Sequence, residues 1–479
     1  MGFIMGFRNT FQPCPSRSRR TPPRRAGAIT AVSLALLAST AIASTFTVTS
    51  VADTNGAACA TDCTLRQAIN AANSTLGFSH LIEFGIAGKG PHLIQIGSPL
   101  PTISHGHVTI DGYSQAGATA NTLANGDDAD LRIVLKPSAH VSTAVNGLVL
   151  CADAIIVRGL SIVGFEDAGI RVGDGGSAGF GPCGAKLPAD GSIVAGNFIG
   201  LDPDGVTANG SHDGVFIDGS ANVRVGGVAL ADRNVIGGNG VSQVGTLNPA
   251  VAGTQILGNY LGTDASGTQD RGAIMGVMIA TSSQGVTVGD PAAPNLIAFN
   301  HNGIAVLTPN ATGHTLFAND FADNENLGID LCADICGSGD SVTLNDANDT
   351  DTGANNLQNF PLLTSATLEY GNLTVEGSLD IPHIATPLPA TYSIALYANG
   401  ACHAPGHGQG DVFLGAESTN LVDGGVTTIE TFSITQDVAV ALGTIMTATA
   451  TDDEGNTSEF SQCVEVFPGD GIYKDSFEE

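Results

Sequence analysis

Apolar residues from about residue 145 onward fall in short runs that each end at Gly, Asn or Asp. Examples of these runs are residues 155–157, 159–163, 169–172, 214–217 and 223–225. Short runs that are rich in Val and Ile and bounded by turn-forming residues predict β-strands. The chain also has 63 Gly and only 13% charged residues, a composition that argues against a helical protein.

The predicted strands recur with a period of 62 residues. The stretch at 196–202 returns at 258–264, and the run at 214–217 returns at 276–279. Such a period, made of short strands, divides into about three coils of ~20 residues and is typical of a solenoid. Each coil has apolar side chains that only a stacked neighbour can bury, so we expect a right-handed parallel β-helix over residues 44–361. The L-x-x-L-x-L frame of leucine-rich repeats is missing, and the lack of Trp argues against propeller blades.

Asparagines recur at the ends of the predicted strands. Asn tolerates the left-handed turn conformation, and stacked amides hydrogen-bond to one another. We therefore expect an asparagine ladder along the solenoid, formed by Asn197, Asn234, Asn259, Asn295, Asn300 and Asn319.

Residues 44–75 are expected to cover the first coil, because an uncapped solenoid end would expose unpaired strand edges. Within this segment, residues 64–73 predict a helix that begins with a capping box made by Thr64 and Gln67. The helical face that can lie on the first coil is formed by Leu65, Ile69 and Ala72. The first coils would be built from the extended segments 80–86, 92–96, 107–112 and 131–135.

The segment from Cys63 to Asn73, with the sequence CTLRQAINAAN, resembles the C-S-L-R-E-A-I…A-A-N signature of exported bacterial CSLREA-domain proteins. Gln67 stands where that family usually has Glu. The family typically continues into right-handed β-helix repeats, and the resemblance extends over residues 45–360, with the signature itself in 45–75. It implies an exported protein with this fold and does not imply a reaction.

After Pro361 the pattern changes to longer alternating strands, such as residues 373–377, 392–397 and 445–451. Strands of this kind, with turns at intervals, predict a separate antiparallel, immunoglobulin-like β-sandwich over residues 362–467. Residues 468–479 form a short acidic tail, for which a disordered terminus and a sorting or docking tag are both open interpretations.

Residues 1–43 are expected to be a secretory signal peptide. They have six Arg and no acid, then an apolar run at 28–37, and they end in the small-x-small cleavage pattern Ala41-Ile42-Ala43. We expect export through the general secretory pathway, which makes the protein secreted, and no later segment reaches the ~20 apolar residues of a membrane span. Removing the six Arg from the 17 Lys and Arg leaves 11 against 46 Asp and Glu, a net charge of −35. This acidity excludes nucleic acid as a partner, and it disfavours anionic polysaccharide unless calcium bridges the two.

Eight cysteines remain after the signal peptide, and an even number in an exported chain predicts disulfides. Local pairs are expected at Cys59/Cys63 and Cys332/Cys336, and a pair linking the ends of the last domain at Cys402/Cys463. Cys151 and Cys183 are the other two candidates, and the full connectivity stays open. Zinc is the weaker alternative at the short pairs, because no His lies at ligand spacing beside them.

The sequence shows no motif of the polysaccharide-degrading β-helix enzymes. The R-x-P-x-x-R motif of pectate lyases is missing, and the G-H-G that polygalacturonase relatives need on a coil lies in the last domain, at 406–408. Asp202 and Asp264 are equivalent in the repeat, so three coils, or ~14 Å, would separate them. That distance is too long for a pair of glycosidase carboxylates. We interpret both as acids of D-x-x-G turns and assign no catalytic residue.

The densest acidic cluster is the stretch 345–353, where side-chain oxygens alternate before a Gly. This spacing resembles a calcium loop that lacks the distal Glu of an EF-hand. The candidate ligands are Asp346, Asp349 and Asp351, and calcium bound there would brace the junction between the β-helix and the last domain. An acidic linker without a bound ion is the open alternative.

Four histidines, His105, His107, His403 and His407, have no acid or Cys partner at useful spacing, and we expect them at the surface. With six Tyr and no Trp, the chain has no obvious carbohydrate module. We favour an exported repeat protein that binds glycans or other cell-surface molecules with its long β-helix face and is not an enzyme. The alternative is a polysaccharide lyase or glycoside hydrolase with an unrecognised acidic site. The oligomeric state stays open.

Overall fold

The computed structural model describes residues 43–56, 58–138, 146–175, 182–184, 188–280, 284–332, 342–382, 390–403, 406–421 and 428–469. The expected signal peptide, apart from its last residue, lies outside this part of the chain, as do Cys336 and residues 470–479 of the acidic tail. No helix of the described residues is long and apolar enough to cross a membrane.

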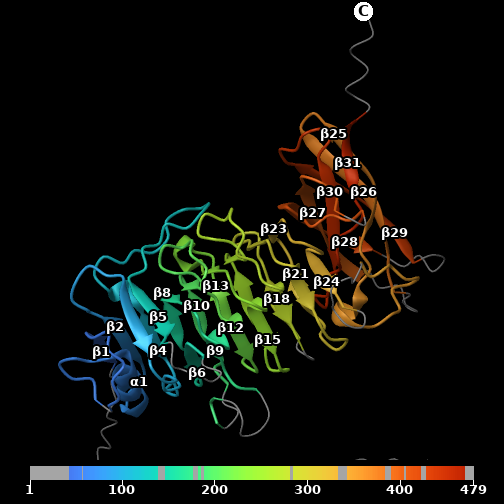
Figure 1. The fold of residues 1–479 in the computed structure, drawn as a ribbon. Helices are drawn as coiled ribbons and strands as arrows, with labels where there is room; N and C mark the ends of the chain where they lie inside the picture. The colour runs from blue at the N-terminus through green and yellow to red at the C-terminus, as the bar shows by residue number, and fades with distance from the viewer. Residues whose placement is uncertain are drawn as a thin grey trace, which may run out of the picture. The chain divides into compact units, whose positions relative to one another are not determined.

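Three parallel sheets form the body of residues 44–331 (Figure 1). Sheet A contains β1 (Ser44–Val48), β2 (His80–Phe84), β4 (Val108–Asp111), β7 (Ile156–Arg158), β10 (Ile193–Ala195), β13 (Arg224–Gly226), β16 (Gln255–Leu257), β19 (Thr287–Val288) and β22 (Thr315–Leu316). Sheet B contains β3 (His92–Ile96), β5 (Ile133–Pro137), β8 (Leu160–Ile162), β11 (Phe198–Ile199), β14 (Val235–Ile236), β17 (Tyr260–Leu261), β20 (Leu296–Ala298) and β23 (Asp320–Ala322). Sheet C contains β6 (Leu148–Leu150), β9 (Ala168–Val172), β12 (Asp213–Asp218), β15 (Ser242–Leu247), β18 (Met275–Ile279), β21 (Asn302–Val306) and β24 (Ile329–Leu331).

Successive coils each add one strand to each sheet, and the pairings are parallel, as in β10–β13, β11–β14 and β12–β15. This arrangement confirms the predicted right-handed parallel β-helix. Inward positions form continuous apolar rows, and the row in sheet A is Ile110, Val157, Val194, Val225, Ile256, Val288 and Leu316, all fully buried. Each member of such a row is covered only when the next coil is present.

The coils are longer than the sequence analysis predicted. Ile193 pairs with Arg224, and Arg224 pairs with Gln255, so each of these coils takes 31 residues. The 62-residue repeat is therefore two coils, and the prediction of three coils of ~20 residues was wrong. The repeat spans two coils because β11 and β17 are each followed by a hairpin, closed by the bridges Leu201–Ala208 and Thr263–Asp270, whereas β14 between them continues directly toward sheet C.

An asparagine ladder does run along the solenoid. The Asn197 amide donates to Asn234 Oδ1 at 3.1 Å, and Asn234 and Asn259 donate to the next rung at 2.9 and 3.0 Å. Asn295 donates to Asn319 at 2.8 Å, and all five side chains are fully buried. Asn300, predicted as a member of this ladder, donates instead to Asn324 at 3.4 Å, in a different row. The ladder asparagines do not have the left-handed conformation that was expected of them. The residue before three of them has it instead, namely Gly196, Gly258 and Ala318 with φ of 69°, 67° and 55°, whereas Arg233 before Asn234 has φ of −56°. That turn directs the amide inward, where it also caps backbone carbonyls.

The N-terminal end is covered as predicted. Helix α1 (Leu65–Ser74) has Thr64 as its N-cap, and the Gln67 side chain accepts from the Thr64 N–H at 3.0 Å to complete the capping box. Leu65, Ile69 and Ala72 are buried in the same core as the first strands. The Arg66 guanidinium is also buried, and it bonds to both carboxylate oxygens of Asp53 at 2.7 and 2.8 Å.

The C-terminal sheet has the strand order β28-β27-β30-β31-β25-β26-β29. Its strands are β25 (Leu362–Glu369), β26 (Asn372–Asp380), β27 (Ala390–Asn399), β28 (Val412–Leu421), β29 (Ile429–Asp437), β30 (Ile445–Thr451) and β31 (Val464–Pro468). All pairs are antiparallel except β25–β31, which is parallel, so the sheet is mixed rather than purely antiparallel. Val375 and Ile434 from one end share a core with Ile394 and Met446 from the other, which gives a sandwich-like packing.

This C-terminal sheet also covers the last coil of the solenoid. The backbone N–H groups of the last strand in each sheet are satisfied by bonds from Leu316 to Thr457 Oγ1 (3.0 Å), from Phe321 to the Gly410 carbonyl (3.1 Å) and from Leu331 to Glu459 Oε1 (2.8 Å). Gln409 Oε1 accepts from the Asn324 N–H at 3.2 Å. Sequence analysis predicted only the N-terminal cap, but both ends of the solenoid are covered.

Disulfides join Cys59 to Cys63 and Cys402 to Cys463, which confirms two predicted pairs. Cys151 is bonded to Cys183. Cys332 is disulfide-bonded as well, and its predicted partner lies outside the described residues. Three short 3₁₀ helices, η1 (Gly112–Ser114), η2 (Leu230–Asp232) and η3 (Ala354–Leu357), complete the described elements.

Candidate functional site

The residues that precede the strands of sheet C lie in one row along the solenoid. Backbone hydrogen bonds join each coil to the next along this row, for example from the Val241 N–H to the His212 carbonyl at 2.8 Å and from the Asp213 N–H to the Asp167 carbonyl at 3.0 Å. The members of the row, in chain order, are Asp167, His212, Val241, Ile274, His301 and Asn326. Polar and titratable side chains from different coils therefore lie along one line on the β-helix, at the start of the sheet C strands.

A groove with a volume of about 630 Å³ lies along the central part of this edge. It is lined by Asn239, Gly240, Asp270, Gly272, Ala273, Ile274, Phe299, His301 and Glu325, which come from four successive coils. Three steps between coils give the groove a length of roughly 14 Å at a strand spacing of ~4.8 Å. An extended ligand that lies parallel to the solenoid axis matches this shape.

Phe299 lines the groove in an unfavourable backbone conformation. Its φ is 60°, in the left-handed region, whereas the equivalent turn two coils earlier uses Gly238. A left-handed backbone costs a non-glycine residue roughly 1–2 kcal/mol, and bulky residues rarely adopt it. The side chain is only partly buried, so packing in the core does not explain its presence. Ile274, 48% exposed, adds a second apolar side chain to the groove.

Polar groups of the groove are held in defined orientations. His301 Nδ1 lies 2.6 Å from a Glu325 carboxylate oxygen, and the Asn326 amide lies 2.9 Å from His301 Nε2. The Asn326 amide donates to Nε2, so the imidazole Nδ1–H donates to Glu325. Asp270, which also lines the groove, accepts from the Gly272 N–H and is exposed. The groove thus offers carboxylate acceptors beside an apolar floor.

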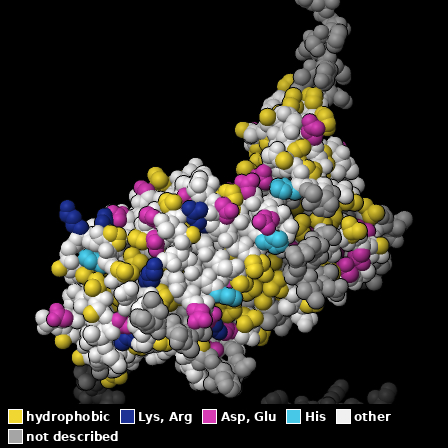
Figure 2. Space-filling model, viewed as in Figure 1, with side chains coloured by type: hydrophobic (Ala, Val, Ile, Leu, Met, Phe, Trp, Pro, Cys, Tyr) yellow, Lys and Arg dark blue, Asp and Glu magenta, His cyan; other side chains and the backbone are white. Residues whose placement is uncertain are grey.

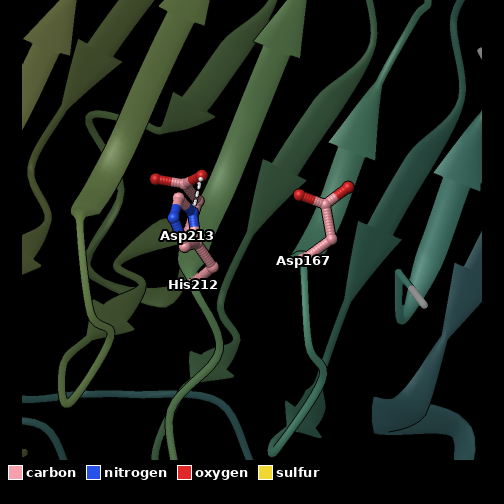
Figure 3. Close-up of side chains that lie close together, drawn as sticks. All are labelled: Asp167, His212 and Asp213. Atoms are coloured by element: carbon pink, nitrogen blue, oxygen red, sulfur yellow. Dashed lines mark hydrogen bonds and ion pairs between the residues drawn. The ribbon is translucent and has the colours of Figure 1, made fainter. Parts of the chain in front are cut away.

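A second group of side chains lies at the start of β9 and β12 (Figure 3). One ligand atom each from Asp167, His212 and Asp213 lies within 4.8 Å of the others. His212 Nδ1 is 2.9 Å from Asp213 Oδ2, while Asp213 Oδ1 accepts from both the hydroxyl and the N–H of Ser242. This group was not predicted from the sequence, because Asp167 comes from one coil and His212 and Asp213 come from the next. Aligning the Gly-Ile and Gly-Val pairs that open β9 and β12 is the signal that would have brought them together.

The predicted calcium ligands are brought together by the fold. Oxygens of Asp346, Asp349 and Asp351 lie within 4.8 Å of one another. Asp349 and Asp351 border a cavity of about 350 Å³ that is also lined by Asp452, Asp453 and Glu454. Burial raises the pKa of Asp349 to about 7, opposed by the Asn359 N–H and reinforced by the neighbouring carboxylates. The bound calcium itself stays a prediction.

The repeated acids serve turns, as interpreted from the sequence. Asp264 accepts from the N–H groups of Ser266 and Thr268, and the loop closes at Gly267 with φ of 76°. Asp202 begins the equivalent turn. The two lie two coils apart, or roughly 10 Å at ~4.8 Å per coil, rather than three coils.

One expectation about the histidines was wrong. His407 is buried rather than at the surface, and its Nδ1 is 2.7 Å from the Phe460 carbonyl. It joins the loop before β28 to the segment between β30 and β31, so it has a structural role. His107 is exposed and stacks on Phe78.

No protein-family model and no curated protein matches this chain. Among solved structures, the chain is similar to full-length tailspike protein 2 from an Escherichia coli O157:H7 bacteriophage, with 11% identity, a TM-score of 0.27 and coverage of 85% of this chain. The chain spans 66% of that tailspike. The enzymatically active domain of the same tailspike is also similar, with 11% identity, a TM-score of 0.24, and coverage of 84% of this chain and 73% of the domain. We draw no functional argument from similarity at this level.

Proposed function

We propose that this chain is an exported β-helix protein that binds an uncharged glycan in the groove along the start of sheet C. The observation that carries the proposal is Phe299. A bulky aromatic side chain occupies a left-handed position at which glycine serves in the equivalent turn, and it lines a groove instead of filling the core. Strained residues cluster at binding and active sites, where function compensates for the strain.

The groove has the mixed chemistry that a sugar requires. Aromatic and aliphatic side chains pack on the apolar face of a sugar ring, and Phe299 and Ile274 supply such surface. Carboxylates accept hydrogen bonds from hydroxyl groups, and Asp270 and Glu325 line the groove together with these side chains.

Charge narrows the class of glycan. The sequence has no Lys or Arg between Arg271 and Lys474, and on the face that Figure 2 shows, basic side chains lie over the N-terminal half. An anionic polysaccharide would meet Asp270 and Glu325 without a compensating cation among the groove residues, so like charges would repel it. An uncharged polymer avoids this penalty.

Export is proposed on the same grounds as in the sequence analysis. The disulfides of the described residues support this proposal, because disulfides form and persist in oxidising compartments. Membership of the CSLREA-domain family stays a prediction that rests on residues 63–73.

The direct test is binding of the mature protein to a panel of soluble polysaccharides, by isothermal titration calorimetry. Dextran, mannan and xyloglucan represent uncharged chains, and alginate and polygalacturonate represent anionic ones. We expect saturable binding of at least one uncharged polymer, with an affinity that is roughly tenfold weaker in Phe299→Gly and also weaker in His301→Ala. Binding restricted to the anionic polymers would contradict the proposal.

Glycan cleavage is the second candidate, and the geometry of Asp167 and Asp213 favours it. Their closest oxygens fall within 4.8 Å, near the ~5–5.5 Å between carboxyl groups of retaining glycosidases. The same panel, assayed for new reducing ends and for unsaturated products, tests this function. Turnover that disappears in Asp213→Asn would establish an enzyme, and turnover that persists would place the activity elsewhere or in a contaminant.

A further inference from the structure

We propose that Asp167, His212 and Asp213 form a binding site for one divalent metal ion of the zinc or manganese class. The site goes beyond the proposed glycan binding and does not depend on it. Figure 3 shows His212 and Asp213 at the start of one strand and Asp167 at the start of its neighbour. The Asp213 N–H donates to the Asp167 carbonyl at 3.0 Å, which fixes the two coils in register at this point.

The ligand types select the metal class. One imidazole nitrogen and two carboxylates, with no thiolate, suit Zn²⁺ and Mn²⁺, whereas an all-oxygen set suits Ca²⁺. Donor atoms around a zinc ion at 2.0–2.2 Å lie roughly 3.4 Å apart. His212 Nδ1 and Asp213 Oδ2 are already 2.9 Å apart. An oxygen of the Asp167 carboxylate, which is 34% exposed and lies 3.5 Å from Arg171, is within 4.8 Å of both atoms.

Asp213, the most buried of the three ligands, forms no ion pair with a Lys or Arg among the described residues. The Asp213 side chain is only 5% exposed, and its ion pair among the described residues is with His212, which is charged only when protonated. Arg171 is shared, because its guanidinium contacts Asp218 and lies 3.5 Å from Asp167. A buried carboxylate needs a compensating cation. A divalent ion coordinated by a neutral imidazole supplies that charge.

Hydrogen bonds from Ser242 fix the orientation of the Asp213 carboxylate. Ser242 donates its hydroxyl (2.6 Å) and its N–H (3.1 Å) to Asp213 Oδ1 and leaves Oδ2 directed at His212. Hydrogen bonds from neighbouring groups to a metal ligand orient the ligand and raise the affinity for the metal. On metal binding, Nδ1 coordinates the ion and the imidazole proton resides on Nε2. The His212 side chain is 56% exposed, so solvent reaches the ion and coordination positions stay open.

The test is titration of the mature protein with Zn²⁺, followed by calorimetry and, with Co²⁺ as a probe, by visible absorption. We expect one saturable site, with affinity at least tenfold weaker in His212→Ala and in Asp167→Asn and with the cobalt bands lost. His301→Ala is the matched control, because that His lies in the same row beside Glu325 and belongs to a different site. The Zn²⁺ affinity of His301→Ala should equal that of the wild type.

Two results would overturn the proposal. One is the absence of saturable Zn²⁺ binding, and the other is binding that His212→Ala leaves intact. Both His212 and Asp167 are partly exposed, so these variants should fold, and circular dichroism checks this. Asp346→Asn tests the other possible Zn²⁺ site, the acidic cluster of Asp346, Asp349 and Asp351. If Zn²⁺ binding is lost in that variant, the ion binds at the acidic cluster and not at His212.

Discussion

Replacing Phe299 by Gly tests whether this side chain serves glycan binding or stabilises the fold. Glycine removes roughly 1–2 kcal/mol of left-handed strain. Against this gain, the variant loses about two thirds of the burial of a Phe side chain, roughly 1–2 kcal/mol, and adds about 0.5–1 kcal/mol of backbone entropy in the unfolded state. The free energy of unfolding should therefore fall by no more than about 2 kcal/mol, although a large side chain has been removed.

Binding should respond differently. The variant loses the contact between the Phe299 ring and a sugar ring. If that contact contributes about 1.4 kcal/mol, glycan affinity falls roughly tenfold. Urea denaturation measures the stability, and calorimetry with the uncharged polysaccharide that binds the wild type measures the affinity. Phe78→Ala is the control, since Phe78 is 59% exposed and lies near the N-terminal cap. The reasoning is refuted if Phe299→Gly costs more than about 3 kcal/mol of stability, as for a core Phe, or if its glycan affinity equals that of the wild type.

Three further predictions concern stability. Asn259→Ala removes a fully buried rung whose amide donates to the Val225 and Leu257 carbonyls, so it should cost about 2–5 kcal/mol in urea denaturation; a cost below 1 kcal/mol would contradict the ladder's role. Tyr397→Phe leaves the buried Ala318 N–H without its acceptor and should cost about 1–2 kcal/mol, whereas Tyr370→Phe, at an 83% exposed position, should cost nothing measurable. Burial raises the pKa of Asp349 from 3.8 to about 7, so stability from this group is complete below pH 4 and is lost as the pH rises through 7. Asp349→Asn should flatten that fall, and calcium should raise the melting temperature of the wild type near pH 7; no effect of calcium would contradict a bound ion.

The architecture was predictable because burial imposes a repeating pattern. Short Val- and Ile-rich runs with turn formers indicated parallel coils, and Thr64 and Gln67 indicated the capping helix. The number of coils was not predictable from the period alone. Hairpins follow β11 and β17 but not β14, so the sequence repeats only after two coils.

The candidate site was largely hidden from the sequence. Asp213 pairs with Ala168, 45 positions earlier, because the chain between β9 and β12 is longer than a standard coil. That offset breaks the period that would have aligned Asp167 with His212. The significance of Phe299 lies in its φ, which no spacing of residues reports. By contrast, Asp346, Asp349 and Asp351 are close in sequence, so their clustering could be anticipated.

Covering of the second solenoid end was also hidden. Thr457, Gly410 and Glu459 belong to loops of the C-terminal sheet, more than 80 residues beyond the strands that they satisfy. Nothing in the local sequence of these loops distinguishes an end-capping residue from an ordinary polar loop residue. Only the tertiary arrangement reveals that role.

The most direct test of the central claim is hydrogen–deuterium exchange of the mature protein, free and saturated with the uncharged polysaccharide that it binds. Glycan in the groove should slow exchange in the peptides that contain residues 239–240, 272–274, 299–301 and 325, and leave helix α1 and the C-terminal sheet unchanged. Protection elsewhere in the molecule, with none in these four peptides, would contradict the account.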